Sequence, residues 1–140
     1  MFKNNYEIVI HAPVEKVWSA LTDSGEIAKY MKNVKVISDW KQGSDIEYTC
    51  YNTDGSIMEW NNMKMIWKGS IEIYDENKEF TCVYPNSESG LTKESYFLEK
   101  IDQNTTTVVL IQHTISQKIA DDYRDGSTEM MDMFKIYLEK

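Results

Sequence analysis

The sequence has few of the residues on which several protein classes depend. Cys50 and Cys82 are the only cysteines among 140 residues, which is too few for a disulfide scaffold. Arg124 is the single arginine, and acidic side chains outnumber basic ones by 23 to 15. A chain with this balance cannot present a dense basic surface to a phosphate backbone, so we expect no nucleic-acid partner.

Long apolar runs are also missing. No stretch approaches the roughly 18 uninterrupted apolar residues of a membrane-spanning helix. The opening run MFKNNYEIVI lacks the basic flank and long apolar run that mark a secretory signal. We therefore expect a cytoplasmic protein with no membrane span.

Glycine and histidine are too sparse for the common cofactor and metal motifs. None of the six glycines forms a GxGxxG or GK[ST] phosphate loop. Cys50, Cys82, His11 and His113 show neither CxxC nor HxxxH spacing, whereas a zinc site needs three or four well-spaced ligands. The sequence predicts no metal site and no cofactor.

What is present predicts a globular protein. Hydrophobic residues make up 41% of the chain and charged residues 27%, which is enough apolar material for a packed interior. The length is close to the commonest size of one folding domain, and no linker or internal repeat divides it. We expect residues 1–140 to form a single domain.

The first elements predicted are a strand and two helices. Asn5 to Ile10 alternates between apolar and polar residues, as a half-buried strand does. VEKVWSALTD then places its apolar residues at helical spacing, with Pro13 at the first helical position. The run TDSG is expected to end this helix, and EIAKYM to form a second short one.

From Val34 onward the apolar period changes to two, which predicts strands. Asn61 and Asn62 interrupt one of these runs and predict an irregular segment or a bulge. Val108 to Ile115 is apolar on both faces and predicts an interior strand. Short turns join only antiparallel neighbours, so we expect an antiparallel meander. The predicted turns are Lys41 to Gly43, Asn52 to Gly55, Asp75 to Lys78, Pro85 to Gly90 and Asp102 to Asn104.

The last segment returns to helical spacing. Ile119, Tyr123, Met130, Phe134 and Leu138 fall on one stripe. Glycine weakens a helix interior by about 1 kcal/mol relative to alanine. We therefore expect a short helix, a break near Gly126, and a longer helix after it.

Three runs now carry a family resemblance: IVIHAPVEKVWSALTD, SGEIAKYM and VISDWKQGSDIEY. They resemble the opening of the family named for the activator of Hsp90 ATPase (AHSA1), within the START-like and polyketide-cyclase-like (SRPBCC, Bet v 1-like) superfamily. The run GSTEMMDMFKIYLEK is similar to the family's final helix, with Gly126 kept and Ser127 where a tryptophan is common. The resemblance implies an α+β helix-grip fold, in which a curved antiparallel sheet wraps around a long C-terminal helix and two short helices follow the first strand.

The same resemblance implies a cavity between the concave face of the sheet and the last helix. Strand parity and helix stripes supply candidate lining residues, although one bulge would invert the parity of a strand. Trp40 and Trp60 are candidates for the cavity mouth, while Trp18 is assigned to the core. A solid core built from the same side chains remains the alternative. The candidate ligand-binding residues are Tyr30, Met31, Tyr48, Cys50, Met65, Trp67, Cys82, Tyr84, Tyr96, Leu98, Leu110, Gln112, Met130 and Phe134.

Three functions follow from the resemblance. The first is non-catalytic binding of a small hydrophobic or amphipathic molecule in the cavity. The second is a protein-interaction role as an Hsp90-type co-chaperone, in which the net charge of −8 would complement a basic partner. The third is a cyclase or aromatase type of enzyme, for which the polar candidates are Tyr48, Tyr84, Tyr96, Gln112 and His113. No catalytic residue is assigned, and both a monomer and a homodimer remain open.

Overall fold

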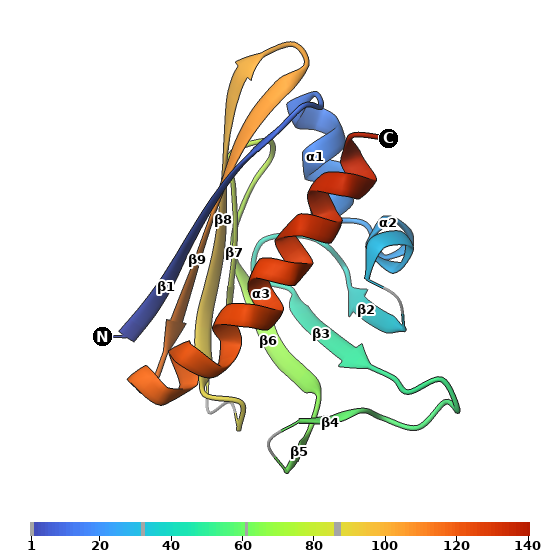
Figure 1. Cartoon of the computed structure of the whole chain (residues 1–140), viewed down its shortest axis with the longest axis vertical. Helices are drawn as coiled ribbons and strands as arrows, with labels where there is room; N and C mark the ends of the chain where they lie inside the picture. Colours follow the sequence, from blue (N-terminus) through green and yellow to red (C-terminus); the bar gives the residue numbers. More distant parts are fainter. Residues whose placement is uncertain (1, 32, 61, 86–87) are drawn as a thin grey trace.

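The described residues form a curved antiparallel sheet that wraps around the last helix of the chain (Figure 1). The structure is a computed structural model that describes residues 2–31, 33–60, 62–85 and 88–140. The elements are β1 (Phe2–Ile10), α1 (Val14–Leu21), α2 (Ser24–Tyr30), β2 (Val34–Ser38), β3 (Asp45–Cys50), β4 (Glu59–Trp60), β5 (Met63–Lys64), β6 (Ile66–Asp75), β7 (Glu79–Val83), β8 (Leu91–Asp102), β9 (Thr105–Thr114) and α3 (Gln117–Leu138). This arrangement confirms the predicted helix-grip fold class.

The large sheet has the strand order β1-β9-β8-β7-β6-β3-β2, and every neighbouring pair is antiparallel. Pairing of β1 with β9 brings Phe2 opposite Thr114. β9 therefore has a neighbour on each side, which confirms the predicted interior strand. Short turns connect β6 to β7 and β8 to β9, as the predicted antiparallel meander requires.

A small hairpin interrupts the meander between β3 and β6. β4 and β5 pair with each other over two residues each and stand apart from the large sheet. The predicted irregularity at Asn61 and Asn62 falls between them, and Asn61 itself lies outside the described residues. Residues 86–87 of the predicted turn at Pro85 to Gly90 also lie outside them.

The two short helices begin one or two residues away from the predicted positions. Pro13 is the N-cap of α1 rather than its first helical residue. α2 starts at Ser24, not at Glu26, because the side chain of Asp23 accepts a hydrogen bond from the backbone N–H of Glu26 at 3.0 Å. α1 ends at Leu21, directly before the predicted stop at TDSG, and only Thr22 and Asp23 separate the helices because Ser24 and Gly25 belong to α2.

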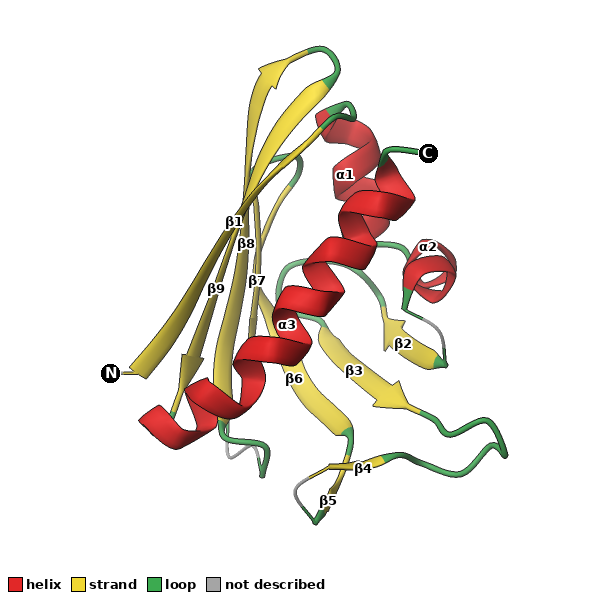
Figure 2. Cartoon of the chain, viewed as in Figure 1, coloured by secondary structure: helices red, strands yellow, loops and turns green. Residues whose placement is uncertain are grey.

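The prediction of a break at Gly126 is wrong, because α3 is continuous (Figure 2). The hydroxyl of Ser116 caps its start by accepting from the N–H of Ile119. Ala120, Ser127, Met131, Phe134 and Leu138 are buried along one side of the helix. Packing of this long face against the sheet outweighs the weak helix preference of one exposed glycine.

A cluster of buried aromatic rings lies where α1 packs on the sheet. Trp18 is 4% exposed, and its ring meets Tyr74 edge-on at 5.2 Å between centroids and Phe80 at 6.1 Å. This confirms Trp18 as a core residue. Trp40, predicted near the cavity mouth, packs instead against Phe80 with 6.1 Å between ring centroids. Away from this cluster, α3 and the side of α2 that carries Ile27 and Tyr30 face the concave side of the sheet.

Candidate functional site

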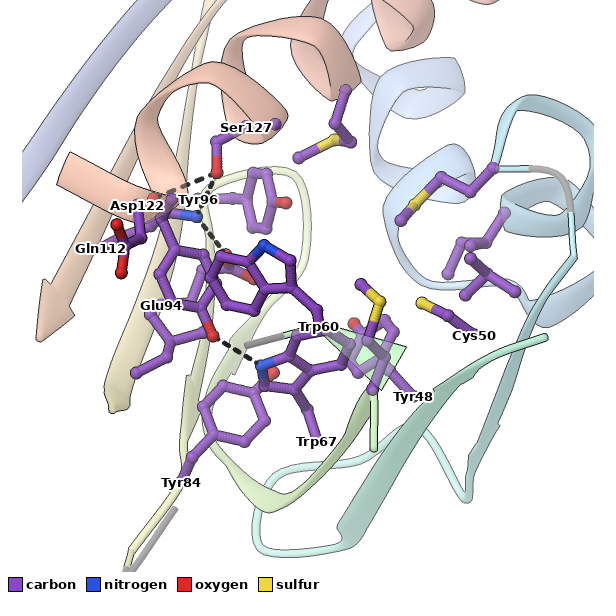
Figure 3. A pocket seen from close by; sticks show the side chains of 18 of the residues that line it. Tyr48, Cys50, Trp60, Trp67, Tyr84, Glu94, Tyr96, Gln112, Asp122 and Ser127 are labelled. Carbon is purple, nitrogen blue, oxygen red and sulfur yellow. Dashed lines mark hydrogen bonds between the residues drawn. The ribbon is translucent and has the colours of Figure 1, made fainter. Parts of the chain in front are cut away.

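A cavity of about 470 Å³ lies between the concave face of the sheet and α3. The side chains around it come from β2, β3, β4, β6, β8, β9, both short helices and the middle of α3 (Figure 3). Its lining residues are Leu21, Ile27, Tyr30, Met31, Val34, Tyr48, Cys50, Trp60, Met65, Trp67, Tyr84, Leu91, Glu94, Tyr96, Gln112, Asp122, Tyr123, Asp125, Gly126, Ser127 and Met130. Most of these side chains are apolar or aromatic, as expected of a site for a small organic molecule.

Two tryptophans and a tyrosine form one wall of the cavity. The indole N–H of Trp67 donates a 2.9 Å hydrogen bond to the hydroxyl of Tyr123. The Tyr123 ring lies 5.0 Å from that of Trp60, edge to face at 71°. These contacts hold three rings from β4, β6 and α3 in fixed orientations, so this wall is formed before any ligand enters.

A polar cluster of three side chains marks one side of the cavity, and Tyr48 and Cys50 lie away from it, toward the other side (Figure 3). The side-chain N–H groups of Gln112 donate to the carboxylate Oε2 of Glu94 and to the hydroxyl of Ser127, each at 2.9 Å. Ser127 donates in return to the Gln112 Oε1 at 3.2 Å. The sheet and α3 are therefore joined by hydrogen bonds through the interior.

Glu94 is the charged group of this cluster. Burial raises its pKa, and the hydrogen bond from Gln112 opposes the shift. The residue keeps some accessible surface because it borders the cavity, but the surrounding protein displaces most of the water that would stabilise a carboxylate. A carboxyl held in this way interacts with a ligand group more strongly than a surface carboxylate does.

The buried tyrosines line the cavity as neutral hydrogen-bonding groups. Burial raises the pKa of Tyr48, Tyr84 and Tyr96 well above the usual range, so their phenols stay protonated. Tyr30 differs because its hydroxyl already donates to the carbonyl of Ala20 at 2.8 Å. No described residue hydrogen-bonds to the hydroxyl of Tyr48 or Tyr96, so each can bond to a molecule in the cavity.

Gly69 makes room for one of these rings. A Cβ on Gly69 would collide with the carbonyl oxygen of Val83 and come within 2.7 Å of the Tyr84 ring. The missing side chain lets β7 approach β6 closely and lets Tyr84 fold over the strand toward the cavity. The position of the Tyr84 ring in the cavity lining thus depends on Gly69, which does not itself border the cavity.

The two thiols differ in their position. Cys50 is half-buried and borders the cavity, whereas Cys82 is buried in the core. Burial raises the pKa of both thiols, which leaves them protonated and poorly nucleophilic at neutral pH. Both are free cysteines.

Ten of the fourteen sequence candidates border the cavity: Tyr30, Met31, Tyr48, Cys50, Met65, Trp67, Tyr84, Tyr96, Gln112 and Met130. The structure corrects the positions of Cys82, Leu98, Leu110 and Phe134, which are packed in the core. Strand parity assigned the three strand residues to the concave face, but the cavity occupies only part of that face. Phe134 is covered by the ring of Tyr30, with 5.1 Å between the centroids.

Sequence reasoning missed Glu94 and Ser127, the partners of Gln112 in the polar cluster. Glu94 has polar neighbours on both sides in the run TKESY, and a charged residue in such a run is typical of the protein surface. Its parity was informative, since Glu94 is two residues before Tyr96 and therefore on the same face of β8. The other lining residues not assigned to the ligand-binding set are Leu21, Ile27, Val34, Trp60, Leu91, Asp122, Tyr123, Asp125 and Gly126.

Comparison with known protein families agrees with this architecture. The family model described as "Activator of Hsp90 ATPase homolog 1-like protein" matches residues 11–139. The chain belongs to this family. No functionally curated protein matches the sequence of this family member.

Solved structures share the fold of this AHSA1-family chain. The solution structure of ChR145 from Cytophaga hutchinsonii is 26% identical, with a TM-score of 0.75 over 99% of this chain and 94% of that one. The Aha1 dimer from Colwellia psychrerythraea is 21% identical, with a TM-score of 0.71 over 99% of this chain and 97% of that one. The di-domain ARO/CYC protein BexL is 14% identical, with a TM-score of 0.76 over 99% of this chain and 47% of that one. The AHSA1-family fold therefore extends to a biosynthetic cyclase.

The described residues contain no cluster of three or more His, Cys, Asp or Glu side chains that could hold a metal ion. In the same part of the chain, no helix has the length and apolar character needed to cross a membrane.

Proposed function

We propose that the protein binds a small hydrophobic or amphipathic molecule in the cavity between the sheet and α3, without transforming it. The observation that carries the proposal is the preformed cavity of about 470 Å³, with aromatic walls and one polar cluster. A cavity of this kind buries an apolar body and fixes its orientation through a few polar groups. The ten sequence candidates that border it are the proposed contact residues, together with Glu94 and Ser127.

The pKa shifts favour binding over catalysis. Acid–base enzymes commonly place two titratable groups in environments that push their pKa values in opposite directions. Here burial raises the pKa of the Glu94 carboxyl, the Cys50 thiol and the Tyr96 phenol alike. His113 follows Gln112 on β9 and so lies on the opposite face of the sheet, away from the cavity.

The test is native mass spectrometry of the protein purified from its own host, followed by extraction of any bound molecule. We expect a stoichiometric ligand that an apolar fluorescent dye displaces. Ser127→Trp should fill part of the cavity and reduce dye binding, while Thr128→Trp, on the exposed neighbouring position, should not. Equal dye binding by both variants and the parent would contradict the proposal.

Cys50 gives a second readout on the unmodified protein. Because its thiol borders the cavity, an occupying molecule should slow its alkylation by iodoacetamide. The unfolded chain, in which Cys50 and Cys82 react freely, supplies the reference rate. Dye binding that leaves the alkylation rate of Cys50 unchanged would place the dye elsewhere on the protein.

A second candidate function is that of a co-chaperone, which the description of the matching family favours. The net charge of −8 would then face a basic surface of the partner. Stimulation of the ATPase rate of purified Hsp90 is the direct assay. Because the similar Aha1 protein from Colwellia is described as a dimer, light scattering should establish whether this chain also forms one. The two free thiols fit the reducing cytoplasm, where we propose that the protein acts.

A further inference from the structure

The charged groups that line the cavity are all of one sign. Glu94, Asp122 and Asp125 carry carboxyls, and no described lining residue is a lysine, arginine or histidine. Asp122 is paired with Lys118 at 3.0 Å, and Asp125 is exposed. Glu94 is therefore the lining carboxyl whose charge is both buried and uncompensated by a described cation.

The hydrogen bonds of Glu94 leave part of the carboxyl available. Its Oε2 accepts from Gln112, and the Gln112 amide is held in one orientation by Ser127. The Oε1 has no hydrogen-bond partner among the described residues. A carboxylate has lone pairs on both oxygens, so this side chain can accept further hydrogen bonds from a donor in the cavity.

Aromatic rings supply the second feature. Trp60, Trp67, Tyr84, Tyr96 and Tyr123 border the same cavity as Glu94. The faces of such rings carry partial negative charge and attract ammonium groups, and aromatic cages bind quaternary ammonium ligands in this way. The hydrogen bond from the Trp67 indole N–H to the Tyr123 hydroxyl fixes the orientation of two of these rings.

From this combination we infer that the cavity selects an amphipathic molecule that carries an ammonium group beside an apolar body. The apolar body contacts the methionine and aromatic walls, and the ammonium group lies against the Glu94 carboxylate. A fatty acid or another carboxylate of the same shape is disfavoured, because it would bring a second negative charge next to Glu94 in a site of low polarity. This inference rests on the proposed function, since it specifies the ligand of the same cavity.

The experiment compares three probes with one alkyl chain: octylamine, octanol and octanoate. Binding is followed by the fluorescence of the cavity tryptophans Trp60 and Trp67, with displacement of the apolar dye as a parallel readout. We expect octylamine to bind about tenfold or more tightly than octanol, the size of an added charge-assisted hydrogen bond, and octanoate to bind least. Octyltrimethylammonium, which keeps the positive charge but has no N–H to donate, separates hydrogen-bond donation to Glu94 from the attraction of the cation to the carboxylate and the rings.

Variants at two glutamates of β8 locate the effect. Glu94→Gln should remove most of the preference for octylamine over octanol, because the amide keeps a hydrogen-bond acceptor but carries no charge. Glu99→Gln removes the same charge from an exposed position of that strand and should preserve the full preference. The inference is overturned if octanoate binds as tightly as octylamine, or if Glu94→Gln keeps the preference. Failure of all the probes to bind would instead overturn the proposed function, and the ligand preference with it.

Discussion

Truncation of Trp18 and of Met130 to alanine should destabilise the protein very unequally. Trp18 is 4% exposed and packs edge-on against Tyr74 and Phe80 in the core under α1. Met130 is half-buried and borders the cavity on the inner side of α3. The comparison distinguishes a packed interior from a preformed empty space, because both side chains are large and apolar.

The expected magnitudes follow from these surroundings. Trp18→Ala removes a fully packed ring and leaves a new cavity, which costs about 3–5 kcal/mol of unfolding free energy. Full burial of a methionine side chain is worth about 1.5–3 kcal/mol, and Met130 is only half-buried. Its truncation widens a space that already exists, so Met130→Ala should cost about 1 kcal/mol.

Urea denaturation followed by far-ultraviolet circular dichroism measures both losses. Circular dichroism is preferable to fluorescence here, since one variant lacks a tryptophan. The urea slope should be similar in both variants and the parent, so that the midpoints report stability. Losses of equal size at Trp18 and Met130 would show that the space beside α3 is filled in solution, and the argument for a binding cavity would fail.

Three further substitutions test other features. Gly126→Ala should raise the unfolding free energy by about 0.5–1 kcal/mol, because the position is helical and no atom lies within 4 Å of the added Cβ; a loss of stability would contradict the continuous helix. Gly69→Ala should cost about 1–3 kcal/mol and weaken dye binding, since the added carbon collides with Val83 and displaces Tyr84; unchanged midpoints and dye affinity would refute this. Burial raises the pKa of Glu94 in the folded state above its pKa in the unfolded state. As the pH rises from the lower of these pKa values through the higher one, the Glu94 carboxyl therefore destabilises the folded state increasingly. Glu94→Gln should therefore gain stability relative to the parent between acidic and neutral pH, whereas a constant difference across urea titrations would exclude the effect.

The architecture was predictable because it depends on period and turn chemistry. Apolar alternation and short turns specify antiparallel neighbours, and the Trp18 helix is amphipathic. The same rules of parity identified Tyr48 with Cys50 and Met65 with Trp67 as pairs on one face, and all four border the cavity. Local pattern was sufficient wherever one face of an element is uniformly apolar.

The polar cluster was not predictable in the same way. Glutamate and serine are residue types typical of the surface. Glu94 and Ser127 become neighbours of Gln112 only because β8, β9 and α3 come together in the fold. The break predicted at Gly126 was wrong for a related reason. Helix propensity is a local property of the sequence, whereas the burial of Met131 and Phe134 that stabilises the helix depends on tertiary packing. The boundary between cavity and core along β9 is likewise set by α1 and α3, not by β9 itself.

The pairing of β1 with β9 also has a consequence for how the chain reaches its native state. Phe2 pairs with Thr114, so the first strand gains its only sheet neighbour among the described strands when the last strand is in place. Until then the apolar side of β1 has no sheet to join, and an unpaired strand edge is prone to associate with other chains. Contacts so distant in sequence slow folding. During synthesis, β1 therefore has no partner strand until residues 105–114 of β9 have left the ribosome.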